Sequence, residues 1–478
     1  VADRAAIRHR PRHTGVVSSD VVSAPRRSRP RDGYCPRSVD ENDPEGLAGA
    51  YVALGLRLGR VVPGLVDAHV GDPGIARHVD DEPLPVPAAL REEAAALRRR
   101  LGTAPLGPHR AEYLDAQLAA CEVIAARAAG EEVGVVDEIR ACLGVAVVPG
   151  DPERYRAAHA RLADVLDTTE RRLPRALAAF RARDRVAPEH LRPGMAAMTA
   201  ALRERTRETV GLPEGEHVDL EVVAGVPWAG FARRVGRARS VVQVSREAGH
   251  RRAHLPLLAA HEAYPGHHTE MARTELADAA GPERALFLAR TPQSLVAEGA
   301  AECGLEAVVG PGWGSWAAGH LVDAGVPTTP GEGAVGEAVE DAIVPLGAVR
   351  QDAALLLHGS SASDREEQAR AHLRRWLFID DDRAGRMLEF LGHPRWRIHT
   401  TTYVEGAHLV RRWLAARAED GTVGSRFARL LDEPWTPDRL RRETITGRGL
   451  SDTQSDSGPG RAERYPRTVE DPPMSPTV

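Results

Sequence analysis

The sequence predicts a mainly α-helical fold: a multi-helical scaffold with a small antiparallel β-sheet next to the helix that carries the pair His261-Glu262. Through residues 43–209, apolar residues recur at spacings of three, four and seven, the period of a helix that buries one face. The runs 218–223 and 240–245 are instead β-branched and partly alternating, and a Gly-rich connection lies between them. Because these runs directly precede the His-Glu pair, we expect the sheet to lie beside that helix.

Turn residues divide the helical pattern into separate segments, with breaks at 102–105, Gly130 and 149–152. Three apolar stripes are expected to be buried: Leu90, Ala94, Leu97 and Leu101; Leu114, Leu118, Cys121 and Ile124; Leu162, Val165, Leu166, Leu173 and Leu177. Further helices are expected at 292–309, 333–357, 364–377, 383–391, 403–419 and 425–431.

Composition divides the chain into four regions. We expect a disordered basic tail at 1–42, a helical scaffold at 43–210, a catalytic region at 211–450 and a second disordered tail at 451–478. The Arg-rich cluster at 26–31 offers nucleic-acid binding as an alternative role for the first tail. No aromatic residue is interleaved with this cluster, so a solvated tail is the favoured interpretation.

Charge and composition exclude several classes of function. The net charge of −5 gives no general attraction to nucleic acid or to an anionic membrane, so neither is an expected partner. The sequence contains no lysine, which excludes a phosphate-binding P-loop lysine, a Schiff-base lysine and a Ser-Lys dyad. The four cysteines are far apart, and no apolar run approaches the roughly 20 residues of a membrane helix. A cytoplasmic protein is expected, and the sequence does not indicate an oligomeric state.

The stretch 261–270, His-Glu-Ala-Tyr-Pro-Gly-His-His-Thr-Glu, concentrates the candidate chemistry. It begins like the zinc-peptidase signature H-E-x-x-H, in which both histidines bind zinc and the glutamate is the general base. Position i+4 is here Pro265. In a straight helix His261 and His268 would lie about 10.5 Å apart and His267 would face away. A regular helix therefore cannot bring two of these histidines to one zinc ion, which needs each nitrogen at about 2.0–2.1 Å.

The sequence nevertheless predicts a distorted helix at this point. Pro265 cannot donate a hydrogen bond to the carbonyl of His261, and Gly266 tolerates almost any backbone conformation. We expect the helix to kink, bulge or restart after Glu262. A wide bulge could bring His267 back toward a metal ion, and such bulges often mark functional sites.

A third metal ligand is expected from Glu298, about thirty residues downstream, because a following helix commonly supplies a glutamate to His2Glu zinc sites. Glu302 lies one turn later, where a carboxylate can orient a ligand imidazole. The alternative is a pair of acids on a solvated helix face. That alternative is disfavoured because like charges at this spacing repel and the neighbouring residues are small and apolar.

The stretch 261–270 together with Glu298-Gly299 resembles a bacterial family of largely uncharacterised proteins marked by H-E-x-x-P-G-H-H and a downstream E-G motif, itself similar to the gluzincin (thermolysin-like) zinc metallopeptidases. The resemblance spans about half of the chain. It implies His261, His267 and Glu298 as zinc ligands and Glu262 as general base, with His268 as the alternative ligand. The family's common E-G-W-A-L-Y continuation is absent at 298–303, so the resemblance says little about the substrate pocket.

The chemistry that follows is hydrolysis of a peptide or small amide by a water activated on Zn2+, with Glu262 moving the proton. An edge strand before the His-Glu helix would hold the extended substrate. By family analogy Tyr403 would donate to the oxyanion, although a buried structural tyrosine is an equal alternative. The alternative function is a non-catalytic metal-binding protein. Several lone histidines are expected to be structural or exposed: His254, His320, His358, His393 and His399.

Overall fold

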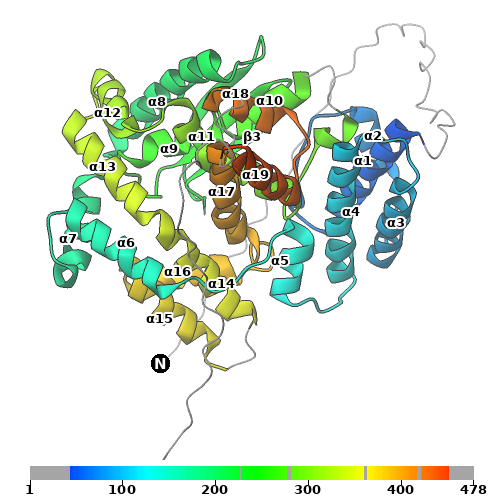
Figure 1. Cartoon of the computed structure of the whole chain (residues 1–478), viewed down its shortest axis with the longest axis horizontal. Coiled ribbons are helices and arrows are strands. Elements are labelled where there is room, and N and C mark those ends of the chain that lie inside the picture. The colour runs from blue at the N-terminus through cyan, green and yellow to red at the C-terminus, as the bar shows by residue number, and fades with distance from the viewer. Residues whose placement is uncertain (1–42, 227, 277–280, 360–362, 417–420, 452–478) are drawn as a thin grey trace, which may run out of the picture. The chain divides into compact units, whose positions relative to one another are not determined.

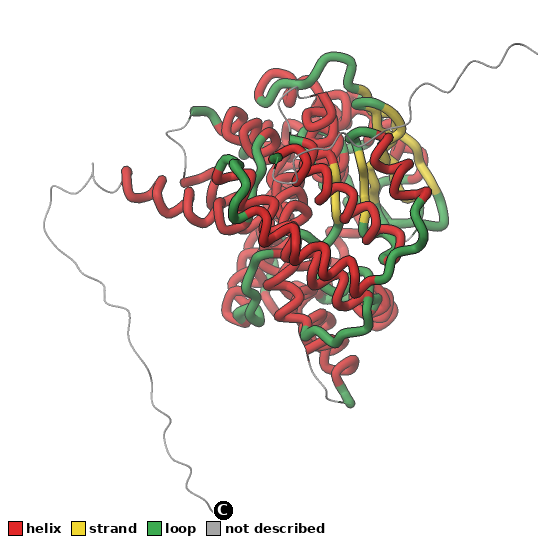
Figure 2. The backbone as a smooth tube through the Cα atoms, turned by 90° about the vertical axis from the view of Figure 1, so that its right-hand side faces the viewer, coloured by secondary structure: helices red, strands yellow, loops and turns green. Residues whose placement is uncertain are grey.

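Helices dominate the computed structural model of the chain, which confirms the mainly α-helical prediction (Figure 1). The structure describes residues 43–226, 228–276, 281–359, 363–416 and 421–451. The tails expected at 1–42 and, apart from Ser451, at 451–478 lie outside these residues. Strands are few and gather in one part of the molecule (Figure 2). None of the described helices is both long and apolar enough to span a membrane.

The first half of the chain forms the expected helices. They are α1 (Pro44–Val61), α2 (Pro73–Asp81), α3 (Pro87–Leu101), α4 (Pro108–Ala128), α5 (Val135–Leu143), α6 (Pro152–Val165), α7 (Leu173–Arg183) and α8 (Pro188–Thr209). In α1, α2 and α6 an aspartate caps the helix and a proline follows it, so the cap accepts a backbone N–H that the helix leaves unpaired. The stripe on α3 is buried as predicted. The third predicted stripe spans two helices, because a 3-10 turn at Glu170–Arg172 separates α6 from α7.

A three-stranded sheet precedes the His-Glu helix, as expected, but its pairing corrects the prediction. Strand β2 (His217–Val223) runs parallel to β4 (Arg239–Ser245), not antiparallel. The reason is an unpredicted strand between them, β3 (Gly230–Gly236), which pairs antiparallel with β4. The chain therefore reverses direction twice between β2 and β4, which leaves these two strands parallel. A second, antiparallel sheet pairs β1 (Val66–His69) with β5 (Leu286–Leu288).

The second half continues as helices. They are α9 (His254–Glu262), α10 (His267–Leu276), α11 (Pro292–Val308), α12 (Trp313–Asp323), α13 (Pro330–Ile343), α14 (Ala348–Gly359), α15 (Arg365–Leu377), α16 (Asp381–Gly392), α17 (His399–Ala416), α18 (Val423–Asp432) and α19 (Pro437–Ser451). The single helix expected at 333–357 is divided by the 3-10 turn Val344–Gly347, which contains a proline. Helices α12 and α19 were not predicted.

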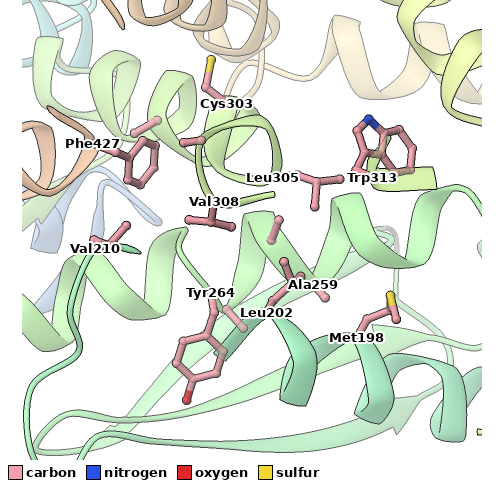
Figure 3. Packing of buried hydrophobic residues seen from close by; sticks show 14 of the residues in the cluster. Met198, Leu202, Val210, Ala259, Tyr264, Cys303, Leu305, Val308, Trp313 and Phe427 are labelled. Carbon is pink, nitrogen blue, oxygen red and sulfur yellow. The ribbon is translucent and has the colours of Figure 1, made fainter. Parts of the chain in front are cut away.

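The described helices share three hydrophobic cores. One core combines residues of α8, α9, α11, α12 and α18, including Met198, Ala259 and Phe427 (Figure 3). A second unites α1, α3, α4 and α5 with β5 and with Leu295 of α11, and a third unites α6 and α7 with α13–α16. All three cores contain residues from both sides of position 210. The expected boundary there is a change in composition and does not separate two cores.

Helices α11 and α17 approach each other at a glycine pair. A Cβ atom added to Gly299 would overlap the backbone of Gly406, and one added to Gly406 would overlap the carbonyl oxygen of Leu295. Only glycine allows two helix backbones to lie this close. The contact brings the start of α17, with Tyr403, beside the segment of α11 that carries Glu298.

Candidate metal centre

The chain leaves α9 and enters α10 through the break that the sequence predicts. Helix α9 ends at Glu262, the Tyr264–Pro265 peptide is cis, and α10 begins at His267. The backbone N–H of Gly266 donates to the carbonyl of Ala260 at 2.9 Å, six residues earlier instead of the usual four. Two extra residues in this wide turn give His267 the place that position i+4 from His261 would take in a regular helix. A Cβ at Gly266 would overlap the carbonyl oxygen of His261, so the turn requires glycine.

The turn, together with α11, brings three ligand-type side chains to one point. The Nε2 atoms of His261 and His267 lie 3.2 Å apart. The Glu298 carboxylate oxygen Oε2 lies 3.3 Å from the first nitrogen and 3.6 Å from the second. Donors at about 2.05 Å from a tetrahedral zinc ion lie about 3.3 Å from one another. The three residues therefore form a group with the spacing of a zinc site.

The electrostatics of the group also fit a cation. Oε2 of Glu298 is buried and accepts no hydrogen bond from any described residue. Burial alone would raise the pKa of this carboxyl, but the two imidazoles outweigh burial and hold that pKa well below its usual range. Burial likewise opposes protonation of His261, yet Glu298 and Glu302 raise its pKa well above the ordinary value. The carboxylate thus requires positive charge beside it, which either protons or a divalent metal ion can supply.

Glu302 lies where a residue that orients a metal ligand is expected. Its Oε1 is 3.3 Å from Nδ1 of His261. If Nδ1 carries the hydrogen for this contact, the lone pair of Nε2 faces Glu298 and His267, as metal ligation requires.

Glu262 lies at the end of α9 beside the strand β3. The residue is only 8% exposed, and its Cγ would be 3.2 Å from a Cβ added to Gly230, so a larger residue on β3 would crowd it. Within the described part of the chain its carboxylate has no hydrogen-bond or ion-pair partner, and it acts electrostatically on His261, His267 and Tyr403. It is therefore free to exchange a proton with a group bound at the site.

Tyr403 reaches the same region from α17. Its ring centroid lies 6.1 Å from that of His261, and its hydroxyl is 2.9 Å from Nε2 of His399. Burial, followed by the charges of Glu298 and Glu262, raises the pKa of Tyr403 well above its usual value, so the phenol remains a hydrogen-bond donor. His399 was expected to be an isolated histidine. Its i, i+4 spacing to Tyr403 is the sequence signal that could have linked the two.

His268, the alternative ligand, does not join the metal group. It is 1% exposed; its Nδ1 lies 2.8 Å from Oγ of Ser240 and its Nε2 lies 3.1 Å from Oε2 of Glu216. Glu216 also accepts hydrogen bonds from Tyr264 and, at 2.7 Å, from Arg203. We call these five residues the Glu216 cluster. Sequence analysis missed Glu216, because no local pattern connects it with a histidine 52 residues later.

Comparison with known proteins gives few matches. No protein-family model and no curated protein matches the chain. Among solved structures the chain is similar to the "putative lipoprotein from Colwellia psychrerythraea", with 15% sequence identity and a TM-score of 0.45 over 79% of this chain and 70% of that one.

Proposed function

We propose that the chain is a zinc-dependent hydrolase, a metallopeptidase that cleaves peptide or small amide bonds. The observation that carries the proposal is the convergence of His261, His267 and Glu298 at zinc-ligand spacing, with the carboxylate of Glu262 unpaired beside them. Two imidazoles and one carboxylate suit zinc and leave one position for water in a tetrahedral site. Zinc, when bound, lowers the pKa of that water and polarises a carbonyl oxygen.

The residues of the chain then have distinct tasks in the proposed reaction. Glu262 accepts a proton from the attacking water and delivers it to the leaving amine. Tyr403 donates a hydrogen bond to the carbonyl oxygen as negative charge develops there. His399 orients the Tyr403 hydroxyl, and Glu302 orients His261. Strand β3 has an outer edge that no other described strand pairs, which supports its role in holding an extended substrate beside Glu262.

Metal analysis and peptide cleavage test the proposal together. The purified protein is expected to hold one zinc ion per chain and to cleave members of a peptide library. Glu262→Gln is expected to keep zinc and to lose about 100- to 10,000-fold in kcat/KM, because it removes only the proton carrier. His267→Ala is expected to lose both zinc and cleavage. Exposed residues supply the matched controls Glu189→Gln and His109→Ala, which are expected to behave like the wild type.

Two outcomes would contradict parts of the proposal. Stoichiometric zinc in His267→Ala would exclude this residue as a ligand. Bound zinc without cleavage of any library peptide, in a folded wild-type protein, would favour the alternative of a non-catalytic metal-binding protein. The cytoplasmic location stays a prediction.

A further inference from the structure

A second group of charged side chains lies near the metal group, around Arg290 and Arg395. Arg290 follows β5 and is only 8% exposed, yet its Nε and Nη2 atoms contact no acceptor among the described residues. It holds the left-handed backbone conformation, with φ of 61°, which is uncommon for a residue with a Cβ. Burying guanidinium N–H donors without acceptors costs free energy. A buried arginine whose donors lack acceptors therefore indicates a binding site for an anion.

Arg395 is held rigidly in the loop before α17. Its Cζ atom lies 4.4 Å from the ring centroid of Trp396. Its guanidinium also covers Gly64, where a Cβ would overlap it. Nε of Arg395 is buried and again has no acceptor within the part of the chain that the structure describes. Stacking between an aromatic ring and a glycine fixes the plane of the guanidinium before any ligand binds, which favours bidentate binding of a carboxylate.

The two arginines lie on segments that meet at residues 64 and 65. The guanidinium of Arg395 lies against Gly64, and the backbone N–H of Ala289, the residue before Arg290, donates to the carbonyl of Leu65 at 2.8 Å. Burial and the positive charges of Arg127 and Arg395 lower the pKa of Arg290, and Glu138 opposes that shift. Glu138 already forms ion pairs with Arg127 at 2.5 Å and with Arg397 at 3.0 Å. Its charge is therefore shared, and the group retains an excess of positive charge.

The loop that carries Arg395 connects this group with the metal ligands. The ring of Trp396, on which Arg395 stacks, lies 5.2 Å from the ring of His399. His399 is hydrogen-bonded to Tyr403, whose ring lies 6.1 Å from that of His261. Asp67 lies on β1, which pairs with β5 just before Arg290; it is exposed, and no described residue forms an ion pair with it. Solvent therefore reaches this side of β1, and neither guanidinium forms an ion pair with a described residue.

We propose that Arg290 and Arg395 form a carboxylate-binding subsite beside the metal ligands, which recognises the C-terminal or an acidic side-chain carboxylate of a peptide. The assignment of the ligand as a peptide rests on the proposed peptidase function. The subsite itself rests on the unpaired guanidinium groups. With this subsite, the proposed enzyme would prefer peptides that carry a carboxylate over neutral amides.

Binding of three small probes tests the subsite without hydrolysis. The full chain carrying Glu262→Gln is titrated calorimetrically with N-acetyl-leucine, with N-acetyl-glutamic acid α-amide and with N-acetyl-leucinamide. These carry an α-carboxylate, a side-chain carboxylate and no carboxylate. At least one acid is expected to bind about 10- to 100-fold more tightly than leucinamide, the ratio that one charged hydrogen-bonded pair supplies. The tighter acid identifies which carboxylate the subsite takes.

Arginine variants in the same background assign the binding to these residues. Arg395→Gln and Arg290→Gln are expected to remove the preference for the acid, whereas the exposed Arg386→Gln is expected to retain it. Since Arg290→Gln alters a buried residue, Arg395→Lys provides a milder test. Lysine keeps the positive charge but lacks the planar guanidinium, so this variant is expected to bind the acid about tenfold more weakly. Equal binding of all three probes by the parent protein would overturn the subsite, as would a preference that survives Arg395→Gln.

The outcomes separate the subsite from the hydrolase. Preferential binding of an acid by a protein that cleaves no peptide would leave the subsite intact and contradict the peptidase. Cleavage of peptide acids and peptide amides with equal kcat/KM would support the peptidase and contradict the subsite.

Discussion

Two clusters adjoin the turn at Gly266, and each of them joins a histidine of α10 to a glutamate from elsewhere in the chain. In the metal group, His267 faces Glu298, whose buried oxygen accepts no hydrogen bond from a described residue. In the Glu216 cluster, His268 is buried and both of its ring nitrogens have partners. In the first cluster three ligand-type atoms converge on one point, and in the second the donors and acceptors match. The first therefore suits a cation, and the second suits a structural role.

The difference shows that adjacent residues of one helix can serve separate purposes. Successive side chains on a helix point about 100° apart, so His267 and His268 necessarily face different elements. Helix α11 supplies a carboxylate on one side, and the segment before β2 supplies one on the other. The Glu216 cluster also holds Tyr264, which precedes the turn, so we expect it to position His267 indirectly.

The largest effect is expected from Glu298→Gln. Replacing the charged ligand with a neutral amide should weaken zinc binding by about 100-fold or more. The zinc ion loses an anionic ligand, and the two imidazoles lose their carboxylate partner. Competition with a chromogenic chelator measures the affinity, and circular dichroism checks the fold. Unchanged zinc affinity would show that Glu298 is not a ligand and would erase the contrast between the clusters.

The matching variant in the second cluster, Glu216→Gln, should reduce stability strongly and zinc affinity only slightly. We expect the free energy of unfolding to fall by about 2–4 kcal/mol, because Arg203 and His268 lose a buried charged partner. Zinc affinity should fall no more than about tenfold, the low end for residues that orient metal ligands, because Glu216 is not bonded to a residue of the metal group. Urea unfolding and chelator competition on the same preparation measure both quantities. Full zinc loss with unchanged stability would contradict the structural role.

The contribution of Glu216 to the free energy of unfolding should also depend on pH. Burial would raise the pKa of Glu216, but hydrogen bonds from His268, Tyr264 and Arg203 outweigh it and lower the pKa to about 2. A depressed pKa stabilises the folded state above the unfolded value of about 4.5 and loses that effect as pH falls toward about 2. The stability difference between wild type and Glu216→Gln should therefore be constant above about pH 5.5 and shrink below pH 4.5. A difference that stays constant down to pH 3 would contradict this assignment.

The smallest effect concerns the turn that separates the clusters. Gly266→Ala should cost about 1–3 kcal/mol of stability, because its Cβ would overlap the carbonyl oxygen of His261. It should also weaken zinc binding by moving His267. Gly319→Ala in α12 is the matched control: an added Cβ meets nothing within 4 Å, and stability should rise by up to about 1 kcal/mol. Equal behaviour of the two variants in thermal unfolding would remove the requirement for glycine in the turn.

Much of the fold could be predicted because it depends on local patterns. The stripe on α3, the Asp-Pro helix starts and the runs that became β2 and β4 are each visible within a few residues. The parallel pairing of β2 with β4 was not predictable in the same way. It depends on β3, whose Gly230–Gly236 segment contains two glycines and two arginines and lacks a strong β pattern.

The sequence by itself determined where the helix breaks, because Pro265 and Gly266 act on the backbone through sterics and a missing hydrogen bond that any fold would feel. It also determined which residue types are available for metal chemistry. Only the tertiary structure decided that His267 faces Glu298 while His268 faces Glu216, and that the loop carrying Arg395 packs beside His399 and Tyr403. The partner of a buried polar side chain is set by elements that arrive from far along the chain. Sequence spacing cannot specify that encounter.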